Sequence, residues 1–226
     1  MEAKSNPGIA AIILAAGGSS RMRPDHKLLL PIRGEAMIRH VVRAARAADL
    51  APIVIVVGCR AKDVTAAIAD LGARCLENPE WETGIASSIR RGIRALPEAC
   101  SAAMILLADM PRVAESHLRR LSTAFAREKA ATILVPTYRG KRGNPLLWGR
   151  RHFAALTALQ GERGGRTLLS ELESFAKEVP MEDDGILVDL DTPQELVKEA
   201  LQSPSTRERN EKRQTGRGSS VTSLPH

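Results

Sequence analysis

Cysteine, aromatic residues and long apolar runs are all scarce in this sequence of 226 residues. The three cysteines, Cys59, Cys75 and Cys100, contain no C-x-x-C pair, which argues against a disulfide framework or a thiolate zinc site and favours a reducing cytosol. The longest apolar run, residues 47–57, is interrupted by an aspartate and a proline, so it cannot span a bilayer. With 43% hydrophobic, 26% charged and 3% aromatic residues, the composition excludes collagen and a wholly disordered chain, and predicts a soluble globular protein.

The excess of basic over acidic residues is modest. The formal net charge is +7, of which residues 203–226 contribute five basic and two acidic side chains. The remaining charge is too small for a surface that wraps a nucleic-acid duplex, so no nucleic-acid partner is expected; it suits small anionic ligands and scattered solvent-facing charges equally well. Residues 1–8 lack the basic region and long apolar stretch of an export signal, which predicts a cytoplasmic protein with no membrane partner.

Short apolar runs alternate with amphipathic segments along the chain. We predict strands over residues 9–14, 53–57, 74–76, 104–108, 132–136, 144–148 and 186–190. We predict helices over residues 36–48, 63–71, 85–96, 115–129, 167–175 and 193–201. This alternation predicts a three-layer, Rossmann-like α/β fold, in which a mostly parallel sheet has helices on both faces and ligands bind at the carboxyl ends of the strands.

The pattern ends before the chain does. Residues 203–226 contain only two aliphatic side chains among Ser, Thr, Arg, Gln and Gly, too few to offset the entropy cost of folding. We therefore predict one folded domain over residues 1–202 and a disordered basic tail over residues 203–226.

The first predicted strand leads into a turn of small residues, Leu14-Ala15-Ala16-Gly17-Gly18. Successive free N–H groups in such a turn form an anion-binding nest, to which Arg21 and Lys27 would add two positive charges for a polyphosphate. The alternative is an ordinary glycine turn with two solvated cations. Neither G-x-x-x-x-G-K-[ST] nor G-x-G-x-x-G is present, so the P-loop and the dinucleotide fingerprint are excluded.

The turn resembles the signature L-A-[AG]-G-x-[SG]-x-R-[MF]-(x)n-K of the MobA-like nucleotidyltransferases, and within them the molybdenum cofactor cytidylyltransferases. The resemblance extends over residues 9–201. The sequence departs from it at residues 23–26, where many members have a glycine and a loop one residue shorter. Further landmarks follow in order at residues 27–31 (KLLLP), 84–89 (GIASSI), 107–111 (LADMP), 142–145 (RGNP), 161–166 (GERGGR) and 189–193 (DLDTP).

Asp109 directly follows a predicted strand at the edge where the glycine turn opens. A carboxylate beside a polyphosphate requires a divalent cation between them, and Mg²⁺ prefers such oxygen ligands. The resemblance implies that Asp109 binds this metal and that Asp191, with Asp189 beside it, completes the site. The alternatives are that Asp109 caps a turn and that the other two support a helix N-terminus, which contributes about 0.3–1 kcal/mol.

Two more regions gain a role from the resemblance. Gly84, Ser87 and Ser88 stand at a predicted helix start, where they would hold the base or ribose of the nucleotide; the alternative is simple N-capping. Asn144 and Arg166 lie in glycine-bearing basic loops that would shape the pocket of the phosphorylated acceptor; the alternative is an ordinary loop with a cation.

The resemblance thus implies a Mg²⁺-dependent nucleotidyltransferase whose triphosphate is neutralised by the loop amides, Arg21 and Lys27. The motif Leu-Ala-Ala-Gly is that of the cytidylyl branch and favours CTP, with molybdopterin as the acceptor and a molybdoenzyme apoprotein as a further partner. One alternative is cytidylyl, uridylyl or guanylyl transfer to another phosphorylated acceptor, such as a sugar or polyol phosphate. The other is a nucleotide- or cofactor-binding chaperone without turnover.

Overall fold

The computed structural model describes residues 8–18, 26–128 and 132–190, together with residues 195 and 199. Within these residues, eight strands form one sheet in the order β10-β7-β9-β6-β1-β4-β5, with β8 paired to β7. β1 pairs in parallel with β4 and β6, as do β4 with β5 and β7 with β10, whereas β8 and β9 run antiparallel to their neighbours. The strands are β1 (Ile9–Ala15), β4 (Ile53–Val57), β5 (Arg74–Glu77), β6 (Ala102–Leu107), β7 (Ile133–Tyr138), β8 (Lys141–Arg142), β9 (Leu146–Gly149) and β10 (Ala176–Pro180), and a separate hairpin joins β2 (Pro31–Ile32) and β3 (Glu35–Ala36).

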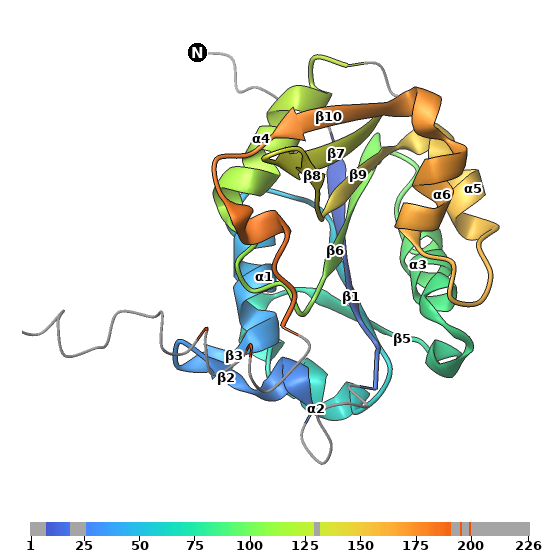
Figure 1. Ribbon diagram of the computed structural model, residues 1–226. Coiled ribbons are helices and arrows are strands. Elements are labelled where there is room, and N and C mark those ends of the chain that lie inside the picture. Colours follow the sequence, from blue (N-terminus) through green and yellow to red (C-terminus); the bar gives the residue numbers. More distant parts are fainter. Residues whose placement is uncertain (1–7, 19–25, 129–131, 191–194, 196–198, 200–226) are drawn as a thin grey trace, which may run out of the picture.

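Helices cover both faces of this sheet, which confirms the predicted three-layer α/β fold (Figure 1). α1 and α4 lie on one face, and α3, α5 and α6 lie on the other. The described helices are α1 (Met37–Ala47), α2 (Ala61–Ala66), α3 (Ile85–Arg94), α4 (Glu115–Phe125), α5 (Phe153–Thr157) and α6 (Gly165–Glu171). The short 3-10 turns are η2 (Lys27–Leu29), η3 (Ala69–Leu71), η4 (Trp81–Thr83), η5 (Arg150–His152), η6 (Glu173–Phe175) and η7 (Asp184–Ile186).

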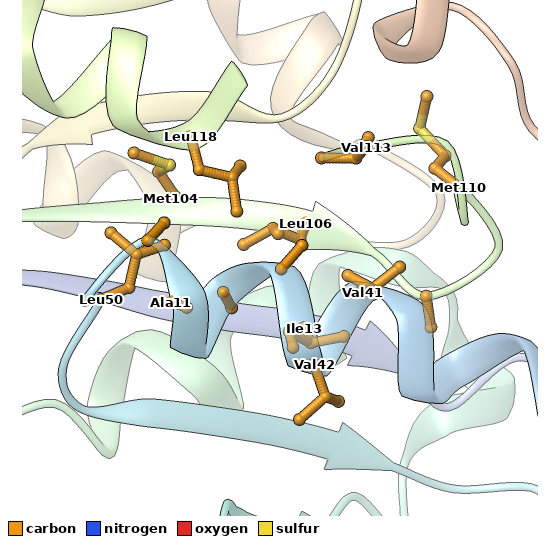
Figure 2. Packing of buried hydrophobic residues seen from close by; sticks show 14 of the residues in the cluster. Ala11, Ile13, Val41, Val42, Leu50, Met104, Leu106, Met110, Val113 and Leu118 are labelled. Atoms are coloured by element: carbon orange, nitrogen blue, oxygen red, sulfur yellow. The ribbon is translucent and has the colours of Figure 1, made fainter. Parts of the chain in front are cut away.

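The central strand β1 supplies side chains to a core on each face of the sheet. Because side chains alternate along a strand, Ala11 and Ile13 enter the cluster beneath α1 and α4, while Ile12 enters the cluster beneath α3. Val41 and Val42 of α1 pack against the first of these clusters, as Figure 2 shows. Both faces of β1 are therefore buried, which is why its sequence is an almost continuous apolar run.

One predicted strand is absent, and several short elements were not predicted. The strand predicted over residues 186–190 is absent: η7 ends at Ile186, and single backbone bonds, from Asn144 N to Ile186 O and from Leu190 N to Asp109 O, replace a sheet ladder. β10 was not predicted because only its Val179 is buried, and the short helix α5 was not predicted either. The helix predicted over residues 193–201 and the tail lie outside the described residues except for Glu195 and Glu199, which are helical.

Candidate active site

The carboxyl ends of β1 and β6 meet at one edge of the sheet. Leu14 and Leu107 are register partners in these parallel strands, and Ala108 N donates to Leu14 O at 3.2 Å. The glycine turn follows β1 and Asp109 follows β6, so the parallel pairing brings the two predicted features side by side.

The glycine turn is held from one side and open on the other. Cys59 N donates to Ala16 O at 3.0 Å, and the Trp81 ring lies against Gly18, where an added Cβ would be 3.1 Å away. At Gly17, by contrast, no heavy atom of the described chain lies within 4 Å of the Cβ position. Gly17 is also exposed, so its backbone is accessible to a ligand.

Lys27 and Asp109 form an ion pair at this edge. Nζ of Lys27 donates to Oδ2 of Asp109 at 2.6 Å, and the two side chains are 14% and 22% exposed. Leu28, the next residue along the chain, is buried in the core and anchors this segment. Lys27 therefore reaches the β6 end of the sheet, while residues 23–25, where the sequence departs from the resemblance, lie outside the described residues. Arg21 lies outside the described residues.

Asp109 also fits a divalent cation. Its second oxygen, Oδ1, is buried and has no hydrogen-bond partner within the described ranges, so its lone pairs can bind a metal ion. No cluster of three His, Cys, Asp or Glu suited to a metal occurs in the described part of the chain, but Mg²⁺ is commonly held by one or two carboxylates together with substrate phosphates. The backbone N–H of Leu190 donates to Asp109 O at 3.0 Å, whereas Asp191 itself lies outside the described residues.

The predicted serines face inward. Ser87 and Ser88 are 3% and 4% exposed, and Nδ2 of Asn78 donates to their hydroxyl oxygens at 2.8 Å and 3.0 Å. Ser87 Oγ in turn donates to Gly84 O at 2.8 Å, so neither hydroxyl caps α3 in this structure. Sequence reasoning missed Asn78, although an asparagine immediately after β5 lies at the ligand-binding edge of the sheet. The nucleotide-binding role of these residues stays a prediction.

A cavity of about 440 Å³ opens beside the ends of β1 and β6. Leu14, Asn144 and Arg166, which the sequence analysis singled out, all line it, as does Asp189. Asn144 is positioned by the hydrogen bond from its backbone N–H to Ile186 O. The sequence analysis did not identify Trp148, which also lines this cavity. The structure thus brings together the two residues predicted to bind the acceptor, and whether they do so stays a prediction.

The chain matches the family described as MobA-like NTP transferase domain over residues 11–176. It is 30% identical to the purine catabolism protein PucB of Bacillus subtilis (strain 168) over 211 residues, covering 87% of this chain and 98% of PucB. It is 33% identical to the bifunctional protein GlmU of Sphingopyxis alaskensis over 147 residues, covering 65% of this chain but only 32% of GlmU. The chain therefore spans about a third of the length of that relative.

Solved structures show the same fold. The crystal structure of Rv0371c from Mycobacterium tuberculosis H37Rv superposes with a TM-score of 0.77 at 25% identity, covering 88% of this chain and all of the other. A complex of Rv0371c with manganese matches with a TM-score of 0.69 at 24% identity, covering 86% of this chain and 99% of that one. Among the residues that the structure describes, no helix is both long and apolar enough to cross a membrane.

Proposed function

We propose that this chain, which belongs to the family of MobA-like NTP transferase domains, transfers the CMP group of CTP to the phosphate of molybdopterin. The observation that carries the proposal is the contact between Lys27 and Asp109 beside the glycine turn. A cation for phosphate and a carboxylate for a metal thus stand together at the ligand-binding edge of a nucleotidyltransferase fold.

In this reaction an oxygen of the acceptor phosphate attacks the α-phosphorus of CTP. The bond from that phosphorus to the oxygen bridging to the β-phosphorus breaks, and pyrophosphate leaves with the electron pair. The protein takes little part in making or breaking covalent bonds, so its role is positioning and charge neutralisation. Backbone N–H groups of residues 15–18 would hold the triphosphate together with Arg21 and Lys27.

Lys27 changes partner in this scheme. The flexible lysine stem lets its ammonium group leave Asp109 for a phosphate oxygen when CTP binds, and the Asp109 carboxylate is then free for a cation. Asp109 and Asp191 would hold Mg²⁺, which when bound supplies positive charge to the phosphate oxygens. The manganese complex of Rv0371c supports a divalent cation as the cofactor.

The choice of CTP follows from Ala16, which gives the turn the Leu-Ala-Ala-Gly sequence of the cytidylyl branch. Gly84, Ser87 and Ser88 would shape the base side of the nucleotide site, with Asn78 fixing the two hydroxyls. Asn144 and Arg166 would receive the acceptor in the cavity that they line.

Two measurements test the proposal. Thermal unfolding with CTP, GTP, UTP or ATP, each with and without Mg²⁺, should show the largest Mg²⁺-dependent stabilisation with CTP, because a ligand that binds only the folded state stabilises it. Pyrophosphate release should then require CTP, Mg²⁺ and molybdopterin together. A preference for GTP would refute the cytidylyl assignment, and a lack of pyrophosphate release with every nucleoside triphosphate in the presence of Mg²⁺ and molybdopterin would refute the enzyme.

Substitution of Lys27 tests the site itself. Lys27→Ala should lower turnover by about 10² to 10³, as the loss of one preorganised donor does. Lys62→Ala is the matched control, since Lys62 is an exposed lysine of α2, and it should retain wild-type turnover. Equal turnover of both variants would contradict the role given to Lys27.

A further inference from the structure

Trp81 connects the phosphate side and the base side of the candidate nucleotide site. It begins η4, the short turn that leads from β5 toward the start of α3, and it is half-buried. Its ring lies against Gly18 in the turn after β1, and its stem lies against Gly58, directly after β4. Both contacts are at the carboxyl ends of parallel strands, where ligands bind in this type of fold.

Two glycines leave room for the indole. At Gly58 an added Cβ would lie 2.6 Å from Cγ and 2.7 Å from Cβ of Trp81, and 2.9 Å from Cβ of Ala16, which is closer than real Cβ atoms approach. At Gly18 it would lie 3.1 Å from Cζ3 and 3.2 Å from Cη2 of Trp81, a tight contact. Neither glycine has a positive φ, so the backbone conformation does not require glycine at either position. Close packing does, and most of it comes from the tryptophan.

The segment that carries Trp81 is fixed to the candidate base-binding residues. Oδ1 of Asn78 accepts from the backbone N–H of Glu80 at 3.1 Å, directly before η4. The same side chain donates through Nδ2 to the hydroxyl oxygens of Ser87 and Ser88. One asparagine thus connects the segment of Trp81 to both serines, and the indole connects that segment to the glycine turn.

We infer that Trp81 is a positioning residue of the nucleotide site, whose indole supports the glycine turn and holds its backbone N–H groups in place for the triphosphate, at a fixed distance from the base-binding residues of α3. This inference rests on the proposed function. The Cβ position of Gly18 points to the ring, whereas that of Gly17 points to open space. The ring therefore supports the turn on the side away from the opening, and it acts through the turn.

The size of the indole is essential to this role. Its five-membered ring, at Cγ, lies against Gly58, and its six-membered ring, at Cζ3 and Cη2, lies against Gly18. A phenyl ring would keep the first contact but is too short to keep the second. Trp81→Phe therefore removes the support of the glycine turn and leaves the contact beside β4 in place.

The first test is CTP binding in the presence of Mg²⁺, measured by isothermal titration calorimetry. Trp81→Phe should weaken CTP binding about tenfold, because the phosphate-binding turn is no longer held in place. Trp148→Phe, the same substitution at the fully buried tryptophan of β9, is the matched control. It should lower the melting temperature and leave CTP affinity within about twofold. Equal losses of CTP affinity in the two variants would overturn the inference.

A double-mutant cycle tests the contact between the ring and the turn. Gly18→Ala adds a methyl group against the six-membered ring, so it should displace the turn and weaken CTP binding about tenfold. In the Trp81→Phe protein the same methyl group enters the space that the six-membered ring has left. The double variant should therefore bind CTP at least as tightly as Trp81→Phe does. A loss equal to the product of the two single losses would show that ring and turn act independently, and would overturn the inference.

Steady-state turnover separates positioning from folding. The ring supports a turn that holds the triphosphate throughout the reaction, so Trp81→Phe should raise the KM for CTP about tenfold and leave kcat within about twofold. A variant that merely unfolds more easily would lose active molecules, which lowers kcat at an unchanged KM. That result would overturn the inference.

The outcomes separate this inference from the proposed function. If the wild-type protein binds CTP and Trp81→Phe binds it equally well, the inference is overturned and the proposed function stands. If no nucleoside triphosphate binds the wild-type protein in the presence of Mg²⁺, the proposed function fails and the inference fails with it.

Discussion

His26 is a buried residue directly before Lys27. Its side chain is only 2% exposed. Burial, and secondarily the nearby positive charge of Arg60, lower the pKa of His26 below its ordinary value of 6.5. Burial close to the positive charges of Arg60 and Lys27 therefore favours the neutral imidazole over the charged one.

The lowered pKa of His26 predicts a dependence of stability on pH. Between its folded pKa and 6.5 the unfolded state binds more protons at this residue than the folded state does, so the free energy of unfolding increases as the pH rises. His26 should therefore cause no further change in the free energy of unfolding above pH 6.5, and that free energy should fall as the pH is lowered below this value. Urea unfolding at pH 5.5 and 7.5 measures the difference.

His26→Leu should reduce this difference, because it removes the group that titrates. His40→Gln is the control: the His40 ring is within 2.7 Å of Ile32 O, and its replacement should leave the His26 contribution in place. An unchanged pH dependence in His26→Leu would contradict the assignment.

Helix α3 begins where two glycine loops touch. Gly84 has a φ of +110°, and a Cβ there would lie 2.3 Å from Gly161 O. Ala86 N donates to the same carbonyl oxygen at 3.1 Å, so the loop after α5 is fixed to the start of α3. The loop that contains Gly161 and leads into α6 lies beside the cavity. Its placement therefore depends on a glycine at position 84.

Gly84→Ala and Gly17→Ala should separate stability from function. Alanine at Gly84 meets both a strained backbone and a carbonyl oxygen, and should destabilise the protein by about 1–3 kcal/mol. Alanine at Gly17 meets nothing in the described chain, so stability should stay within about 0.5 kcal/mol of the wild type. The Gly17 methyl group would nevertheless stand where the triphosphate approaches the backbone, and CTP affinity should fall at least tenfold.

Denaturant unfolding and CTP titration of the two variants check these expectations. The assignment of Gly17 to the phosphate site fails if Gly17→Ala binds CTP as the wild type does. A Gly84→Ala protein as stable as the wild type would contradict the close packing of Gly84 against Gly161.

At the scale of the whole molecule, Glu199 connects three distant parts of the chain. Its side chain is 1% exposed and lies 2.6 Å both from Arg33, beside the β2–β3 hairpin, and from Arg112, in the connection between β6 and α4. Arg112 is three residues beyond Asp109. Through Arg112, Glu199 therefore holds in place the segment that follows Asp109, the candidate metal ligand.

Glu199→Gln should lower the free energy of unfolding by about 1–3 kcal/mol, because Arg33 and Arg112 lose a buried, charged acceptor. For a chain of this size each kcal/mol corresponds to about 2–4 °C in melting temperature. Glu98→Gln, at an exposed position between α3 and β6, is the control and should melt as the wild type does. Equal melting temperatures of the two variants would contradict the role of Glu199.

Local sequence was sufficient for some parts of the site and insufficient for others. The glycine turn and Asp109 could be predicted because each directly follows an apolar strand, and parallel strands place such positions at one edge. The inward orientation of Ser87 and Ser88 could not, because it depends on Asn78, nine or ten residues earlier. The indole N–H of Trp148, which has no partner in the described part of the chain, was equally hidden, since an apolar strand residue gives no sign of it.

The alternation of buried strands and amphipathic helices, by itself, determined the α/β class of this protein, because apolar periodicity dictates which segments must be buried. It also predicted that the candidate site lies at the carboxyl ends of the parallel strands. Only the tertiary structure decided that Lys27 contacts Asp109, 82 residues away, and that residues 186–190 form no strand. Both result from contacts between segments distant in sequence, a side-chain ion pair in the first case and the backbone approach of Gly143 to Ile186 in the second. Such contacts leave no periodic signal in either segment.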